Sequence, residues 1–324
     1  MRKLLFQTIR LLTLNYFFQK RQKNNLMIFM FHQVNDDNKL FYPAMPVSTF
    51  KNLMIFIKSN YEIIHVSQIN SHFRKTKHSA AIISFDDAHY DIISNALPIL
   101  NELKIPFNIN VDTEIISTGK PQDFVRVYDI INHSTLETYL NEKFMKKTII
   151  INRKNPIHTE NEFTAVLSKL SSLEKRELVD DLARMTEMKI ENYSRMLSEE
   201  DIVNLSDSNI EFGSHSHTHA ILTNISDDLI HSELKQSKEI LENLTKKKIN
   251  ILAYPNGMSD ARVEKIAQDL GYSIFLQTED KINKINMDKE IKISYKRINQ
   301  YHRNLNEALA HSYGITNQLK KYLH

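Results

Sequence analysis

Short apolar runs that end abruptly in polar residues recur along most of the chain. They cover residues 26–31, 80–85, 106–111, 210–212, 249–254, 274–276 and 291–298. Segments with helical spacing of apolar residues lie between several of them, at residues 48–60, 89–103, 227–244 and 260–270. Strands that alternate with helices are typical of parallel βαβ units. The pattern therefore predicts an α/β fold, a distorted (β/α) barrel of about seven parallel strands.

The stretch from about residue 120 to 205 breaks this alternation. It is rich in Leu, Glu, Lys and Met with helical spacing, as in residues 162–170 and 173–185. We expect a helical insertion between two barrel strands, either a lid over a site or structural padding. The predicted organisation is a basic segment at 1–25, one barrel domain at 26–312 that contains the insertion, and a tail at 313–324.

The composition describes a folded protein with restricted chemistry. Hydrophobic residues make up 41% of the 324 positions and charged residues 25%, which are ordinary values for soluble domains. There is no cysteine, which excludes disulfides, thiolate zinc sites and cysteine nucleophiles, and leaves His, Asp and Glu as metal ligands. Of five glycines, Gly213 and Gly257 stand beside polar residues, where a backbone requirement for glycine is expected.

The N-terminal segment carries the positive charge. The net charge is +3, but residues 1–25 hold six basic residues and no acidic one, so the remainder is mildly acidic, which argues against a nucleic-acid groove. This segment lacks the clean apolar run and cleavage site of a signal peptide. We expect an amphipathic helix that either rests on an anionic membrane surface or packs across one barrel end. The expected location is the cytoplasm or the inner membrane surface.

Two adjacent aspartates, Asp86 and Asp87, follow the apolar run at residues 80–85. Two negative charges beside a buried strand require compensation, which a cation would provide. In the turn that leaves the strand, both carboxylates can reach one pocket, where one would bind a metal and the other would accept a proton. The alternative is that one of them caps the helix expected to begin near His89.

A histidine cluster follows another strand, at residues 213–219, Gly-Ser-His-Ser-His-Thr-His. His215 and His219 share a face in either a helix or a strand, whereas His217 would support them or lie at the surface. With Asp87 they give one carboxylate and two imidazoles, a ligand set that leaves positions open for water and substrate. A divalent ion, with zinc favoured, would activate water there, and Asp86 would act as the base.

Two further features belong to the same predicted barrel rim. A turn at Tyr254, Pro255, Asn256 and Gly257 could aim a backbone N–H of Asn256 or Gly257 at an oxyanion, although Pro-Asn-Gly is also adequate as a plain tight turn. His32 ends the first strand and is either the general acid or a core histidine that bonds to the backbone.

These residues resemble the polysaccharide deacetylase family, the NodB-homology domain of carbohydrate esterase family four. Residues 84–87 look like its first motif, which supplies the base and then a metal ligand. Residues 213–219 resemble the second motif, with two histidine ligands four apart. Residues 253–257 resemble the third, which lines the acetate-binding groove. Residues 26–34, with His32, and Arg297 with Ile298 resemble a subgroup that acts on cell-surface and exported polysaccharides.

The chain also departs from the family pattern. Ala88 stands where a glycine usually follows the paired aspartates, and Asn256 replaces a tyrosine. The arginine that often precedes the third motif and orients the base is absent, and Arg297 is a candidate substitute. No late Leu-X-His motif of the usual kind is evident, because the Leu-Ala-His sequence that ends at His311 lies beyond the last expected strand of the barrel, at 291–298.

The resemblance implies a metal-dependent hydrolase that removes N-acetyl groups from an N-acetylhexosamine-containing polysaccharide or its precursor. It implies metal ligation by Asp87, His215 and His219, catalysis by Asp86 and His32, and substrate binding by Tyr254, Pro255, Asn256, Gly257 and Arg297. The alternatives are a catalytically retired carbohydrate-binding protein and a metal-dependent hydrolase of a non-sugar amide or an O-acetyl ester.

Overall fold

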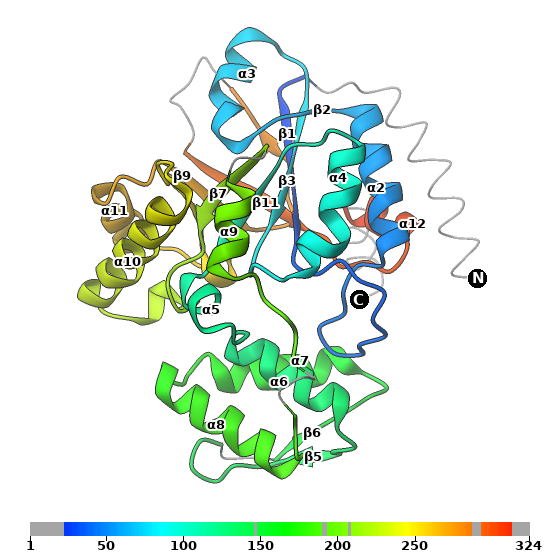
Figure 1. The fold of residues 1–324 in the computed structure, drawn as a ribbon, viewed down its shortest axis with the longest axis vertical. Helices are drawn as coiled ribbons and strands as arrows, with labels where there is room; N and C mark the ends of the chain where they lie inside the picture. Colours follow the sequence, from blue (N-terminus) through cyan, green and yellow to red (C-terminus); the bar gives the residue numbers. More distant parts are fainter. Residues whose placement is uncertain (1–22, 146–147, 190–192, 207–208, 287–292, 313–324) are drawn as a thin grey trace. The chain divides into compact units, whose positions relative to one another are not determined.

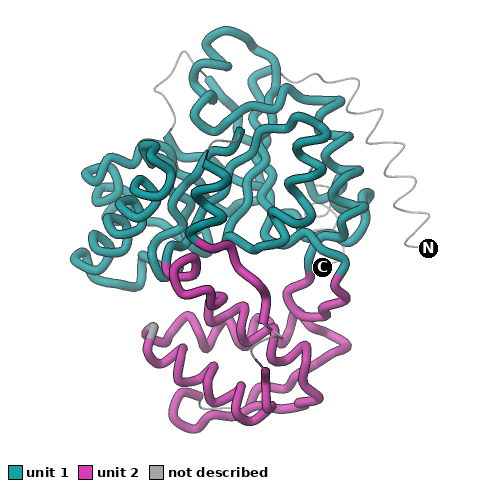
Figure 2. The backbone as a smooth tube through the Cα atoms, in the orientation of Figure 1, with its two compact units in different colours: residues 1–36, 44–113, 199–324 teal, residues 37–43, 114–198 magenta. Residues whose placement is uncertain are grey.

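The computed structural model describes residues 23–145, 148–189, 193–206, 209–286 and 293–312. The chain divides into two compact units, one made of residues 1–36, 44–113 and 199–324 and the other of residues 37–43 and 114–198 (Figure 2). The predicted amphipathic helix at 1–25 lies almost entirely outside the described residues, and the tail at 313–324 lies wholly outside them.

Seven parallel strands close into a barrel in the first unit (Figure 1). Around the barrel they follow the order β1 (Asn25–Phe31), β11 (Ser294–Asn299), β9 (Ile274–Thr278), β8 (Ile251–Ala253), β7 (Ile210–Ser214), β4 (Phe107–Val111) and β3 (Ala80–Phe85), and β3 pairs with β1. Two short strands extend the sheet: β10 (Asn283–Lys284) pairs antiparallel with β1, and β2 (Glu62–Ile63) pairs parallel with β3. The predicted α/β barrel is confirmed.

The barrel interior changes from apolar to polar toward the carboxyl ends of the strands. Alternate strand residues share one face, and the amino-terminal positions of the inner face, such as Ile28, Ile82 and Tyr295, belong to one buried apolar cluster. Two residues further along, the same alternation brings Ser84 and Arg297 inward, where they contact each other. The next position on β3's inner face is Asp86, so the strand periodicity itself delivers the predicted base to the interior.

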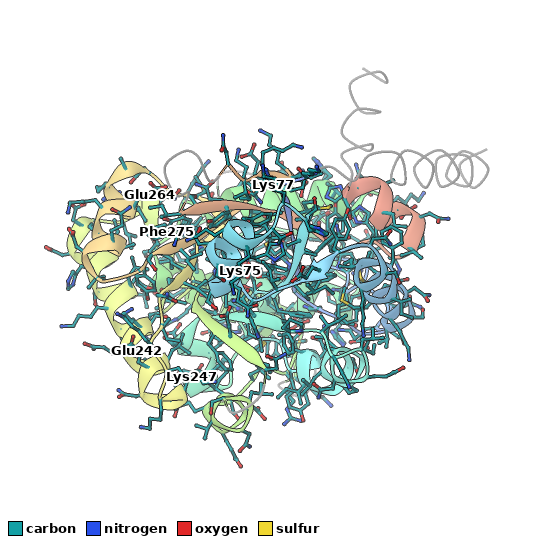
Figure 3. All side chains as sticks on the ribbon, turned by 90° about the horizontal axis from the view of Figure 1, so that it is seen from above. Lys75, Lys77, Glu242, Lys247, Glu264 and Phe275 are labelled. Atoms are coloured by element: carbon teal, nitrogen blue, oxygen red, sulfur yellow. The ribbon has the colours of Figure 1, made fainter. Side chains whose placement is uncertain are left out.

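Helices cover the outside of the barrel. They are α2 (Val47–Asn60), α3 (Ile69–Lys75), α4 (Leu97–Glu102), α9 (Glu199–Leu205), α10 (Asp227–Thr245), α11 (Ala261–Asp269) and α12 (Leu305–Ser312). The end of α10 and the segment after it, where Figure 3 labels Glu242 and Lys247, are bonded to their surroundings. Glu242 accepts a hydrogen bond from the Ile249 N–H, and Lys247 donates to the Ser206 carbonyl. In the described residues, no helix is both long and apolar enough to cross a membrane.

The helix predicted at 89–103 begins later than expected. It opens with a π-helical turn at Ile92–Ala96 and continues as α4. Pro98 has no N–H to donate to the carbonyl four residues earlier, and a wider turn accommodates that missing bond.

The second unit has its own apolar core. It contains most of α5 (Thr113–Thr118), with α6 (Asp123–His133), α7 (Pro156–Leu167), α8 (Ser172–Met185) and a hairpin of β5 (Thr138–Tyr139) and β6 (Ile149–Ile150). Ser171 and Glu174 form a reciprocal capping box that begins α8. Residues 37–43 join this unit through Phe41, which is buried in the core, and through Lys39, whose Nζ lies 2.8 Å from Asp129 Oδ1. A role for this unit as a lid stays a prediction.

Several residues in the loops at the barrel rim have a left-handed backbone conformation. Asp87, Ala88, Ser216, His219 and Asn256 all have positive φ, between 48° and 66°. For a residue with a Cβ this conformation costs about 1–2 kcal/mol, and Asn tolerates it better than most. Backbone strain is therefore concentrated in the loops that carry the predicted site.

We expect residue 88 to accept glycine but not a β-branched side chain. Ala88→Gly should stay within about 1 kcal/mol of the wild-type free energy of unfolding, because relief of strain offsets the loss of a buried methyl group. Ala88→Val should lose roughly 1–3 kcal/mol, since valine disfavours positive φ and Ala88 is fully buried. Denaturant unfolding measures both, with Ala165→Val, at an exposed position of helix α7, as the control. Equal stability of the two Ala88 variants would contradict this backbone geometry.

Candidate active site

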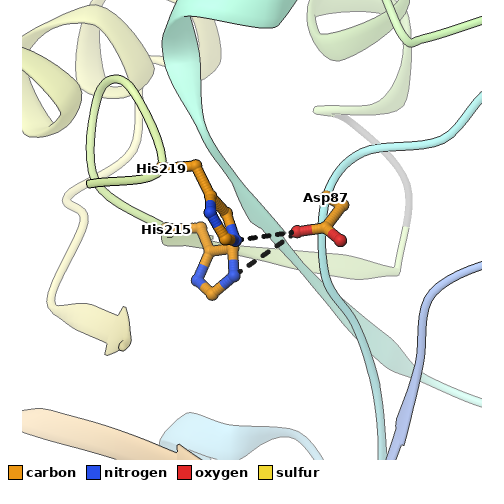
Figure 4. A group of neighbouring side chains, drawn as sticks. All are labelled: Asp87, His215 and His219. Atoms are coloured by element: carbon orange, nitrogen blue, oxygen red, sulfur yellow. Dashed lines mark ion pairs between the residues drawn. The ribbon is translucent and has the colours of Figure 1, made fainter. Parts of the chain in front are cut away.

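Three side chains with metal-ligating atoms meet at the carboxyl ends of β3 and β7 (Figure 4). Asp87 Oδ1 lies 3.5 Å from Nε2 of His215 and 3.5 Å from Nε2 of His219. Two ligands held about 2.1 Å from a tetrahedral zinc ion would be about 3.4 Å apart. In the described part of the chain, no other His, Asp or Glu residues form a group with comparable spacing. The predicted ligands are thus brought together, and their spacing fits a divalent ion.

The His215 ring is oriented for metal binding. Its Nδ1 lies 2.8 Å from the Ala253 carbonyl oxygen at the end of β8, and since a carbonyl only accepts, Nδ1 carries the proton. The lone pair of Nε2 then faces Asp87. A metal-binding imidazole is commonly fixed by such a bond from its other nitrogen.

The carboxylate of Asp86 has two differently placed oxygens. Oδ1 accepts hydrogen bonds from Arg297 Nη1 at 2.6 Å and from Asn110 Nδ2 at 2.7 Å. Oδ2 faces the triad, 3.8 Å from His215 Nε2. One oxygen is therefore held by the barrel interior, and the other is directed to the position where a base is required.

Asp86 stays ionised although it is buried. Burial would raise the pKa of this carboxyl group, but the Arg297 charge, assisted by His215, holds the pKa of Asp86 well below its usual range. A depressed pKa stabilises the fold above the unfolded pKa of about 4, and this contribution is lost as the pH falls toward the folded pKa. At neutral pH the carboxylate can accept a proton.

Arg297 binds the carboxylate of Asp86 from the barrel interior. Its side chain has no exposed surface, and besides Asp86 it reaches the Gln277 carbonyl, 3.4 Å from Nε. This position matches the hypothesis that Arg297 replaces the missing family arginine. A fully buried guanidinium does not offer a surface to a sugar, so the geometry favours base orientation over the predicted substrate binding.

Asn110 is a site residue that sequence reasoning did not identify. It bonds to Ser84 Oγ through Nδ2 at 3.1 Å and accepts from Asn108 Nδ2 at 2.8 Å. Gly213 lies so close that a Cβ there would be 2.3 Å from Asn110 Oδ1, so this glycine is required by close approach. The sequence did contain a signal for Asn110: in strand β4 two asparagines, Asn108 and Asn110, alternate with apolar residues, which indicates that one face of a buried strand is polar.

His32 reaches the site from the end of β1. Its Nε2 is 3.9 Å from Asp87 Oδ2, and 23% of the side chain is exposed. Burial lowers the pKa of His32. The negative charge of Asp86 partly opposes this shift, whereas the positive charge of Arg297 adds to it. With a pKa below its usual value, the imidazole is neutral at neutral pH and must take up a proton before it can donate one.

The turn after β8 is shaped by two close contacts. Tyr254 is fully buried and stacks on Phe275, with 5.8 Å between the ring centroids. Gly257 has φ of +69°, and a Cβ there would lie 2.6 Å from the backbone nitrogen of Thr278. The Gly257 N–H is already used, because it donates to the Tyr254 carbonyl at 2.8 Å. Of the two backbone N–H groups predicted to face an oxyanion, that of the exposed Asn256 is therefore the remaining candidate.

Two other histidines take different places. His217 does not join the triad, since its Nδ1 lies 2.8 Å from Thr113 Oγ1. His311, on α12, forms a pair with Asp280, which follows β9, with 3.2 Å between Nε2 and Oδ2. The carboxyl side of the barrel thus holds a second histidine near a carboxylate, which the sequence analysis set aside.

Removal of the Arg297 charge should be strongly destabilising. Arg297→Met leaves Asp86 buried without its cation, and we expect a loss of about 3–5 kcal/mol in the free energy of unfolding. Adding Asp86→Asn should recover part of the loss, whereas Lys265→Met, in an exposed pair with Asp269, should cost at most about 1 kcal/mol.

The same comparison has a pH dependence. Because protonation of Asp86 removes the need for Arg297, the stability gap between wild type and Arg297→Met should narrow as the pH falls. The unfolded state is common to both proteins, so the narrowing begins at the pKa that burial raises for Asp86 in the variant and continues toward the depressed pKa of Asp86 in wild type. Chemical denaturation at several pH values measures the gap. A gap that stays constant with pH would show that Arg297 does not act through the Asp86 charge.

Comparison with known proteins gives a family match and a shared fold. The family model described as polysaccharide deacetylase matches residues 131–275, a range that includes the histidine cluster and the Tyr254 turn and begins after the paired aspartates. Among proteins of curated function, none matches the sequence.

Several solved deacetylase structures share the fold. The deacetylase PplD of Streptococcus pyogenes, solved in complex with acetate, aligns with a TM-score of 0.58 at 15% identity, over 90% of this chain and 99% of that one. A polysaccharide deacetylase of Bacillus cereus aligns at 0.55 and 19% identity, over 90% and 69%. IcaB of Ammonifex degensii aligns at 0.50 and 14%, over 79% and 84%. The resemblance of this chain to the polysaccharide deacetylase family is therefore confirmed, in sequence over residues 131–275 and in fold over most of its length.

Proposed function

We propose that this protein is a metal-dependent hydrolase that removes N-acetyl groups from an N-acetylhexosamine-containing polysaccharide or its precursor. The observation that carries the proposal is the site geometry. Asp87, His215 and His219 have the spacing of ligands to one divalent ion, and Asp86 directs one oxygen toward the same point. The family match and the fold shared with deacetylases support an acyl group on a sugar amine as the target.

The mechanism divides between the ion and the chain. An ion on Asp87, His215 and His219, which we propose to be zinc, would supply Lewis acidity and lower the pKa of a water molecule. Asp86 Oδ2 takes the proton from the water as its oxygen attacks the acetyl carbonyl carbon. Arg297 and Asn110 keep Oδ1 fixed during this step, so the base does not need to reorient.

The remaining steps require an oxyanion donor and a proton for the leaving amine. We assign the first to the Asn256 N–H, where a preorganised donor stabilises the charge that develops on the carbonyl oxygen. We assign the second to His32, whose partly exposed ring takes up a proton from solvent and delivers it to the sugar nitrogen as the C–N bond breaks. The proton that Asp86 took from the water returns to solvent when the products leave. The products are acetate and a free amine.

Substitutions of the two adjacent aspartates should affect metal binding and turnover differently. Asp86→Asn should keep the metal and lower turnover by at least about 100-fold, because the base is lost while the ligands remain. Asp87→Ala should lose both. Elemental analysis and acetate release from N-acetylated oligosaccharides measure the two properties, with exposed Asp269→Asn as the control. Wild-type turnover in Asp86→Asn would refute the mechanism.

The identity of the proton donor can be tested with two histidine variants. His32→Gln should reduce kcat by about 100-fold or more without changing metal content, since only proton delivery is removed. His311→Gln should change kcat little, because its contact is with Asp280. Acetate release at saturating substrate makes the comparison. If His311→Gln proves the damaging change, the role belongs to His311.

The same assays separate the alternatives. A catalytically retired carbohydrate-binding protein would hold no metal and release no acetate. A hydrolase of a non-sugar amide or an O-acetyl ester would hold metal and leave N-acetylated sugars intact. Contact of residues 1–25 with a membrane surface stays part of the proposal, and vesicle sedimentation of the full chain tests it.

A further inference from the structure

Helix α10 contacts the loop that carries the histidine ligands at two points. Glu233 and Ser237, one helical turn apart, both face this loop. Ser237 Oγ lies 2.8 Å from Ser214 Oγ, before the first ligand. Glu233 binds the loop further along, between the two ligands, where it meets residues His217 and Thr218.

Glu233 accepts three hydrogen bonds from two consecutive residues. Its Oε2 accepts from the backbone N–H of His217 at 2.9 Å and from that of Thr218 at 2.8 Å. Its Oε1 accepts from Thr218 Oγ1 at 2.8 Å. An ionised acceptor makes such bonds stronger than neutral ones. Both oxygens of the carboxylate are thus used on one short segment.

This segment needs an external constraint. Ser216 has φ of 65° and His219 has φ of 55°, and residues 214–219 contain no glycine. Left-handed conformations of non-glycine residues persist when the surroundings over-determine them. The bonds to Glu233 lie between these two strained residues, where they oppose relaxation of the turn. The direction of the His219 side chain depends on that turn, because a change in φ at residue 219 moves Nε2 away from Asp87.

We propose that Glu233 is a positioning residue of the metal site, which holds the 216–219 turn so that His219 Nε2 is preorganised for the ion. This inference rests on the proposed metal-dependent function. Glu233 is not a catalytic residue, since its contacts are with the loop. If it served the fold alone, its removal would lower stability and leave the metal affinity of the folded protein unchanged.

The test is a metal titration of the metal-free full chain. Calorimetric titration with Zn²⁺ should show a Kd about 10–100-fold higher for Glu233→Ala than for wild type. Glu233→Gln should remain close to wild type, because its amide oxygen can accept the two N–H bonds while its NH₂ group donates to the Thr218 hydroxyl. Exposed Glu239→Ala, on the same helix, is the matched control.

A kinetic readout separates positioning from catalysis. At saturating Zn²⁺, Glu233→Ala should regain most of its kcat with KM unchanged, because bound metal restores the turn. An unchanged Kd in Glu233→Ala would overturn the proposal. Should that variant fail to fold, Thr218→Val removes only the bond to Oε1 and should raise Kd by roughly tenfold; an unchanged Kd there would overturn it equally. If wild type binds no Zn²⁺, the proposed function fails together with this inference, whereas wild-type binding with insensitive variants refutes only the inference.

Discussion

The contact between Asp86 and Arg297 is the interaction on which the rest of the site depends. Two adjacent carboxylates are buried at the end of β3, with exposed fractions of 2% and 1%. Charges in such a place are costly unless each is paired. Arg297 compensates Asp86, and under the proposed function an ion on Asp87, His215 and His219 would balance the Asp87 charge. The fold would then use a permanent internal cation for one carboxylate and an exchangeable cation for the other.

The barrel interior makes this division possible. Its apolar half provides burial, and its polar half provides donors at fixed positions on β3, β4 and β11. Because these donors stand on paired strands of the barrel, the base is held by residues whose backbone is itself hydrogen-bonded to neighbouring strands. The ligands, in contrast, come from strained loops, and Glu233 on α10 binds the one that carries the two histidines.

Sequence patterns predicted the seven strands, the barrel and the meeting of Asp87 with His215 and His219, because these follow from local periodicity and from the rule that parallel strands end at one rim. Partners contributed by distant elements could not be predicted in this way. Asn110 and Glu233 became visible only with the order of strands and the placement of α10. Arg297 was noticed, but its depth in the barrel depends on the register of β11 against β9. The π-helical turn before α4 reflects Pro98, a local signal that the sequence prediction of one regular helix did not use.

The inward position of Arg297 has a consequence for how this chain can change its length. In β11, Tyr295 and Arg297 share the inner face only because they are two residues apart. A single-residue insertion or deletion between them would exchange the faces of the strand and turn the guanidinium out of the barrel. Loops elsewhere can grow or shrink without this effect. Insertions and deletions that preserve the site must therefore avoid β11 or occur there in even numbers of residues. The charge balance at the base thus also restricts which changes of length this strand can accept.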